Sequence, residues 1–197
     1  MSRSNTRMAL WIVTVLVLAV QFGCILSPDK GPCDNCGPPD TNQFRPLTDK
    51  ENVIYNLVLS YKVADIQRYD DLLHPDFVWH NQKDPASPNL EEQWSRPEDF
   101  RRTSNMFKAT RRGYSDPDLN LDRLELDIKA AAWEPVDSVG GAPCTDCWQT
   151  TREYYITAVT EGGDTYIGND LSLFIVVPVD KGGTKIYQLW RQDDMPK

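Results

Sequence analysis

The sequence lacks the motifs that identify the common hydrolases and nucleotide-binding enzymes. It contains no glycine-rich phosphate loop, no HExxH zinc motif and no GxSxG nucleophile motif. Basic residues are also scarce, because 21 Lys and Arg stand against 29 Asp and Glu, which gives a formal net charge of −8. An acidic chain is repelled by phosphate backbones, so we expect no nucleic-acid partner.

Long hydrophobic runs are missing as well. The uncharged apolar run Met8–Val20 is shorter than the about 20 residues that a membrane-spanning helix needs. It has the length of the apolar region of a secretory signal, and Arg3 and Arg7 precede it. The run therefore predicts a chain that is exported from the cytoplasm.

The residues after this run resemble the lipobox of bacterial lipoproteins. The segment Gln21-Phe22-Gly23-Cys24 places a small residue before a cysteine, where that family is cleaved and then acylated. The resemblance implies a signal peptide over residues 1–23, a lipidated Cys24 and a bilayer as partner. Because Ile25 rather than Asp follows the cysteine, the outer membrane is expected in a two-membraned host. Gln21 stands where the family prefers Leu, so a plain cleaved signal is the alternative.

Composition divides the rest of the chain into a tether and one domain. Residues 24–47 are rich in Pro and Gly and poor in apolar residues, which is typical of an extended linker. Residues 48–197 have the size and composition of a single globular domain.

Hydrophobic periodicity predicts three helices in the first half of this domain. Thr48 and Glu51 form a capping box before apolar residues at helical spacing as far as Ala64. Asp65 caps a short second helix, which His74-Pro75 ends. A third helix begins at Ser95, with Glu98 completing a second capping box.

Strand-like alternation dominates the second half. Strands are expected at 124–132, 148–160, 165–177 and 185–191, with a loop at 137–147. One short strand, at 77–82, is expected earlier, between the second and third helices. Turns rich in Gly and Asp at 161–164 and 180–183 join the last three strands into hairpins. We therefore predict an α+β fold with three N-terminal helices packed on a strongly curved antiparallel sheet.

This order of elements resembles the NTF2-like superfamily, also called SnoaL-like or cystatin-like. The segments Asn56–Trp79, Trp94–Phe107 and Lys185–Asp193 are similar to its helix pair, third helix and closing strand. The resemblance implies a cone whose mouth holds a ligand, in a superfamily that includes isomerases, cyclases, dehydratases, transport factors and binding modules. The expected pocket wall is aromatic: Trp79, Phe100, Phe107, Tyr155, Phe174 and Trp190.

His80 is the candidate acid–base residue. Alternation along its strand puts it opposite Trp79, so an inward Trp79 would turn His80 outward. No acid–base pair is placed by the sequence, and we expect binding of a small apolar ligand or a protein partner without catalysis. A SnoaL-like isomerase, cyclase or hydrolase is the alternative, favoured if a deep pocket holds His80 or an Asp beside Trp79. A homodimer formed through the exposed face of the sheet is compatible with either function.

Two CxxC pairs of cysteines are the most specific motif in the sequence. Cys33 and Cys36 lie in the tether, and Cys144 and Cys147 lie in the loop between strands. The four thiolates have the spacing of a structural zinc site, whereas an oxidising compartment favours two disulfides, and the spacing does not choose between them. Under either interpretation we expect the pairs to meet as a clasp, worth about 4 kcal/mol per link in the chain-entropy model.

Overall fold

The computed structural model describes residues 43–81, 92–115 and 119–195. The expected signal peptide, Cys24, Cys33 and Cys36 lie outside the described residues. Within these ranges, no helix combines the length and the hydropathy that crossing a membrane would require.

The first two helices are α2 (Lys50–Val63) and α3 (Ile66–Leu72). Asp49 caps α2, because its side chain accepts a hydrogen bond from the backbone N–H of Glu51 at 2.8 Å. The capping box predicted from Thr48 is therefore wrong by one residue. Asp65 caps α3 as predicted, and it directly follows Ala64, whose left-handed backbone ends α2.

The third helix, α4 (Arg96–Thr110), begins after Ser95. Ser95 makes no capping hydrogen bond with its side chain, so the second predicted capping box is also wrong. Glu98 instead accepts hydrogen bonds from Arg101 and Arg102 one turn further along the helix. The first turn keeps its acidic residues, which interact favourably with the helix dipole.

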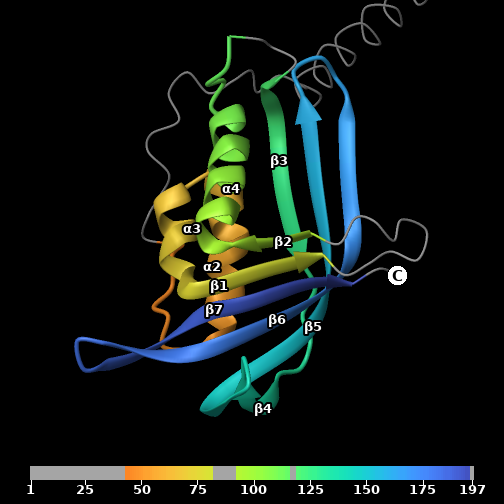
Figure 1. The fold of residues 1–197 in the computed structure, drawn as a ribbon. Coiled ribbons are helices and arrows are strands. Elements are labelled where there is room, and N and C mark those ends of the chain that lie inside the picture. Colours follow the sequence, from red (N-terminus) through yellow and green to blue (C-terminus); the bar gives the residue numbers. More distant parts are fainter. Residues whose placement is uncertain (1–42, 82–91, 116–118, 196–197) are drawn as a thin grey trace, which may run out of the picture. The chain divides into compact units, whose positions relative to one another are not determined.

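Seven strands form one open, curled sheet, and the three helices pack on it (Figure 1). They are β1 (Leu73–Asn81), β2 (Glu92–Ser95), β3 (Leu121–Ile128), β4 (Glu134–Val139), β5 (Ala142–Thr160), β6 (Thr165–Lys181) and β7 (Thr184–Met195). The strand order is β2-β1-β7-β6-β5-β3, and β4 pairs with β5 beside this path.

Three features of the predicted α+β architecture need correction. The sheet is mixed, because β1 pairs in parallel with β7 while every other pairing in the described chain is antiparallel. The helices do not all precede the sheet, since β1, at the place of the strand expected at 77–82, and the unpredicted β2 lie between α3 and α4. The expected loop at 137–147 is a hairpin of β4 and β5 that turns at Gly140 and Gly141, both with positive φ.

The core lies between the helices and the inner face of the sheet. Its centre joins helix residues to strand residues, all buried: Val53, Leu57, Leu72, Leu73, Phe77, Phe107, Phe174, Val176 and Leu189. Phe107 makes edge-to-face contacts with Tyr61 and Tyr69, at centroid distances of 5.1 and 6.1 Å.

A bulge in β7 changes which residues face this core. The register pairs Val176 with Leu189 and Ile175 with Arg191, so Trp190 has no partner on β6. Before the bulge the inward side chain is Leu189, whereas after it the inward position falls on Gln192, paired with Phe174. Alternation therefore shifts by one residue at Trp190.

An ion pair between a buried arginine and a half-exposed glutamate connects α2 to the sheet. Arg152 on β5, whose side chain is 1% exposed, makes a bidentate contact of 2.9 and 2.7 Å with the carboxylate of Glu51. The indole of Trp133 donates to the same carboxylate at 2.8 Å. The pair fixes the start of α2 against the middle of β5.

Candidate functional site

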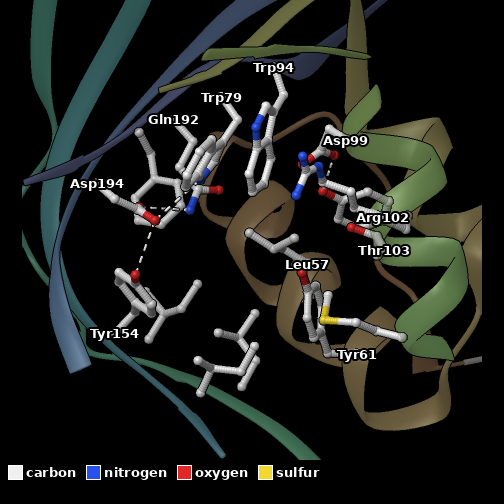
Figure 2. Close-up of a pocket in the computed structure, with 16 residues that line it drawn as sticks. Leu57, Tyr61, Trp79, Trp94, Asp99, Arg102, Thr103, Tyr154, Gln192 and Asp194 are labelled. Atoms are coloured by element: carbon white, nitrogen blue, oxygen red, sulfur yellow. Dashed lines mark hydrogen bonds between the residues drawn. The ribbon is translucent and has the colours of Figure 1, made fainter. Parts of the chain in front are cut away.

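A cavity of about 320 Å³ lies between the helices and the inner face of the sheet (Figure 2). Its aromatic wall consists of Tyr61, Tyr69, Trp79, Trp94, Tyr154 and Phe174. Aliphatic side chains, among them Leu57, Leu126 and Ile156, complete the apolar surface. The polar side chains that line it are Asp99, Arg102, Thr103, Gln192 and Asp194.

Two stacked indoles and a guanidinium form one side of this cavity. Trp79 and Trp94 face each other across the β1–β2 pairing, with ring centroids 3.8 Å apart and planes 19° from parallel. The guanidinium of Arg102 lies 4.0 Å from the ring centroid of Trp94. Its Nε also donates to Glu98 at 2.8 Å, so the stack continues into an ion pair on α4.

Asp194 lies on the sheet side of the cavity and is 8% exposed. Its two oxygens accept four side-chain hydrogen bonds: Ser172 at 2.7 Å, Tyr154 at 3.0 Å, Gln192 at 3.1 Å and the Trp79 indole at 3.2 Å. Burial raises the pKa of Asp194, and these hydrogen bonds counteract part of that rise. The four donors hold the carboxyl in one orientation.

Asp99 lies on the opposite side of the cavity, in the first turn of α4, and is 5% exposed. The hydroxyl of Tyr69 donates to its Oδ2 at 2.6 Å. Burial raises the pKa of Asp99 to about 6, although the Tyr69 hydrogen bond and the charge of Arg102 lower it. The charge of Asp194 raises the pKa of Asp99 further, so the two carboxyls interact electrostatically across the cavity.

The tyrosines of the cavity keep their hydroxyl protons at neutral pH. Burial raises the pKa values of Tyr61, Tyr69 and Tyr154 above the ordinary value. The carboxylates contribute in the same direction, since a negative neighbour disfavours a phenolate.

Two of the six aromatic residues predicted for the pocket wall line the cavity, namely Trp79 and Phe174. Phe107 is 2% exposed and packs in the core behind Tyr61 instead. Phe100 lines a separate surface hollow beside Pro75. Helical periodicity alone does not distinguish a residue that packs in the core from one that lines the cavity.

Tyr155 and Trp190 are likewise absent from the cavity wall. Tyr154 and Ile156 point into the cavity, so alternation turns Tyr155 to the other face of β5, where its hydroxyl donates to Glu153. Trp190 is the bulge residue of β7 and lies close to the backbone of Gly140. The prediction that these two side chains line the pocket is wrong.

His80 lies outside the cavity. Trp79 lines the cavity, and His80 is the next residue on β1, so its side chain is on the opposite face. Its Nδ1 is 3.7 Å from Oδ1 of Asp193, the residue paired with it on β7. The histidine therefore cannot reach a ligand in this cavity from its place in the sheet.

The second CxxC pair lies at the start of β5. Cys144 and Cys147 are joined as a disulfide, with Cα atoms 5.8 Å apart. Among the described residues, no group of three or more His, Cys, Asp and Glu side chains could hold a metal ion. The zinc site would need these two cysteines reduced, and a disulfide clasp would need them linked to Cys33 and Cys36, so both compete with this disulfide. Because Cys33 and Cys36 lie outside the described residues, the zinc site and the clasp stay predictions.

Neither cavity carboxyl, Asp99 or Asp194, was predicted from the sequence. Asp99 is four residues before Thr103 and eight before Phe107, so it shares their helix face, a signal that could have identified it. Asp194 carried no such signal, because the bulge at Trp190 reverses the alternation that precedes it.

No protein-family model matches the chain, and neither does any curated protein sequence. Solved structures do match. An NTF2-like protein of unknown function in nutrient uptake from Rhodospirillum rubrum superposes with a TM-score of 0.51 at 14% identity, over 76% of this chain and 98% of that one. The domain has an NTF2-like fold.

Two further structures have the same architecture as this NTF2-like domain. The beta subunit of the benzoate 1,2-dioxygenase from Burkholderia mallei gives a TM-score of 0.51 at 11% identity, over 77% of this chain and 90% of that one. A conserved protein from Planctomyces limnophilus gives 0.50 at 13% identity, over 75% and 94%. At these identities the likeness establishes the fold alone.

Proposed function

We propose that the NTF2-like domain binds a small, largely apolar molecule in the cavity between its helices and sheet. The observation that carries the proposal is the cavity itself, about 320 Å³, walled by aromatic and aliphatic side chains with two buried carboxyls facing inward. Apolar walls with a few convergent polar groups are typical of small-molecule sites. The walls supply affinity through burial of apolar surface, and the carboxyls supply orientation.

A variant that fills the cavity tests this proposal. Leu126→Trp places a larger side chain at the cavity wall, and Leu119→Trp makes the same change at a leucine that is 56% exposed. A fragment library is screened against the unmodified chain, and the hits are titrated against all three proteins by calorimetry, because six native tryptophans and the added indole would confound a fluorescence signal. We expect hits to lose at least tenfold in affinity for Leu126→Trp and none for Leu119→Trp. Equal affinity for both variants would place binding elsewhere.

Proton-transfer catalysis is a second candidate function, and Asp99 supports it. A general acid or base works best when its pKa lies near the ambient pH, and burial raises the pKa of Asp99 to about 6 inside the cavity. The hydroxyl of Tyr69 provides an adjacent donor. The indole of Trp79 donates to Asp194, and an Asp beside Trp79 in a deep pocket is the arrangement that favours an enzyme. Because four donors already surround Asp194, Asp99 is the better placed of the two for proton transfer.

The two candidates separate in one experiment. Compounds that bind are incubated with the protein in D₂O and followed by NMR. Conversion, or exchange of carbon-bound hydrogen, that Asp99→Asn abolishes indicates catalysis. Binding without either change indicates a binding module.

We also propose, from the sequence, that Cys24 carries the lipid that holds the domain at a membrane. The lipobox-like segment before it supports this proposal. In a bacterial host, Cys24→Ser is expected to move the protein from the membrane fraction to the soluble fraction. A Cys33→Ser variant, changed outside the lipobox, should stay with the membrane.

A further inference from the structure

Hydrogen-bond donors on the cavity wall are bonded to its two carboxyls. The hydroxyl of Tyr69 donates to Asp99, and the hydroxyl of Tyr154 and the indole of Trp79 donate to Asp194. A ligand entering the cavity therefore meets these donors already engaged. What these paired groups leave for it is the acceptor capacity of the carboxyls.

Asp99 holds most of that remaining capacity. An ionised carboxylate can accept about four hydrogen bonds. Asp194 accepts four from side chains, whereas Asp99 accepts one, from Tyr69, in the described part of the chain. A donor on a ligand would find its best partner at Asp99.

The charges of the cavity also do not balance. Neither Asp99 nor Asp194 forms an ion pair with a residue of the described ranges, although both are more than nine-tenths buried. The cationic side chain at the wall, Arg102, lowers the pKa of Asp99 through its charge, but its ion pair is with Glu98 and its guanidinium lies over Trp94. Buried carboxylates are costly without a counter-charge, so this cavity lacks one positive group.

The aromatic walls suit the same missing charge. Cations are attracted to the faces of indole and phenol rings. Arg102 demonstrates this within the site, since its guanidinium lies 4.0 Å from the centroid of Trp94. An anionic ligand, in contrast, would add a third negative charge beside Asp99 and Asp194.

We infer that the ligand of this cavity is a small organic cation, a protonated amine attached to an apolar or aromatic body. The inference rests on the proposed binding function and names the ligand class for it. The ammonium group donates to Asp99, and the apolar body packs on Leu126 and Ile156 at the sheet wall. The aromatic side chains exclude water around the pair and so strengthen it.

Three probes of one shape and different charge test the inference. Phenylethylamine is cationic at pH 7.5, 2-phenylethanol is neutral and phenylacetate is anionic. Titration calorimetry on the full-length chain should give the amine at least tenfold higher affinity than the alcohol, with phenylacetate the weakest. Equal affinities, or tighter binding of phenylacetate, would overturn the inference and leave the proposed function intact. No binding of any probe at millimolar concentration would overturn both.

Matched variants locate the selectivity. Asp99→Asn keeps the shape of the side chain and removes its charge, so the amine should lose about tenfold in affinity and the alcohol should be unaffected. Asp164→Asn makes the same change at an exposed turn and should alter neither. If Asp99→Asn and Asp194→Asn both leave the preference for the amine unchanged, the carboxyls do not recognise the cation and the inference fails.

Discussion

The carboxyl of Asp99 should destabilise the fold that holds it, and Asp99→Asn should reveal by how much. Its pKa rises from 3.8 to about 6 in the folded domain. Each unit of difference between the folded and unfolded pKa corresponds to about 1.4 kcal/mol. At pH 7 the ionised group therefore lowers the free energy of unfolding by about 3 kcal/mol. Asn resembles the protonated carboxyl and removes this cost.

The pH dependence follows from the direction of the pKa change. Between about pH 4 and pH 6 the folded chain keeps a proton on Asp99 that the unfolded chain has released, so the contribution of this group to stability falls as pH rises through that window. Asp99→Asn shows no such fall. The variant should match the parent near pH 3.5 and exceed its unfolding free energy by about 3 kcal/mol at pH 7.

Thermal and urea unfolding across this pH range measure the difference. For a domain of this size, about 3 kcal/mol corresponds to an increase of roughly 6–12 °C in Tm at pH 7. The exposed control Asp164→Asn should leave the unfolding free energy nearly unchanged at every pH. If Asp99→Asn is no more stable than the parent at pH 7, or is equally stabilised at pH 3.5 and pH 7, burial of the ionised Asp99 does not destabilise the fold.

Two substitutions and one mass-mapping measurement test the structure away from the cavity. Glu51→Gln leaves the buried guanidinium of Arg152 without its anion. Because Glu51 is half exposed, the free energy of unfolding in urea should fall by about 2 kcal/mol, less than for a fully buried pair. An unchanged urea midpoint would contradict this. Leu72→Ala removes most of a side chain that is 2% exposed and should lower the free energy of unfolding by about 3 kcal/mol in the same assay. A decrease below about 1 kcal/mol would indicate that the core collapses into the space left by the leucine. Mass mapping without reductant should find Cys144 and Cys147 in one tryptic peptide, two hydrogen masses below its reduced form, and a cross-linked peptide would disprove this pairing.

The helices and most strands could be predicted because their signals are local. The apolar spacing before Ala64 and the cap at Asp65 depend on neighbours within one or two turns. The parallel pairing of β1 with β7 could not be predicted, since nothing in residues 73–81 indicates a partner more than a hundred positions away. The predicted antiparallel sheet failed at that long-range contact.

The cavity was predicted as a shape but not as a set of polar groups. Trp79 was predicted to line the pocket, and alternation along its short strand places His80 on the other face. Asp194 depended on the unpaired Trp190, and a bulge has no reliable signature in a single sequence. In the sequence Asp99 resembles an ordinary acidic residue of a first helical turn. Only its position on the same helix face as Thr103 indicates that its side chain is buried.

The place of β7 has a consequence for synthesis. Of the described strands it leaves the ribosome last, yet it lies between β1 and β6 in the middle of the sheet. Until it emerges, the hairpin of β1 and β2 and the long hairpin of β5 and β6 have no strand to join them, and each exposes an unpaired edge that can aggregate. The sheet of this domain can therefore close only after β7 has left the ribosome, and a nascent chain that still lacks β7 should need a chaperone to cover those edges.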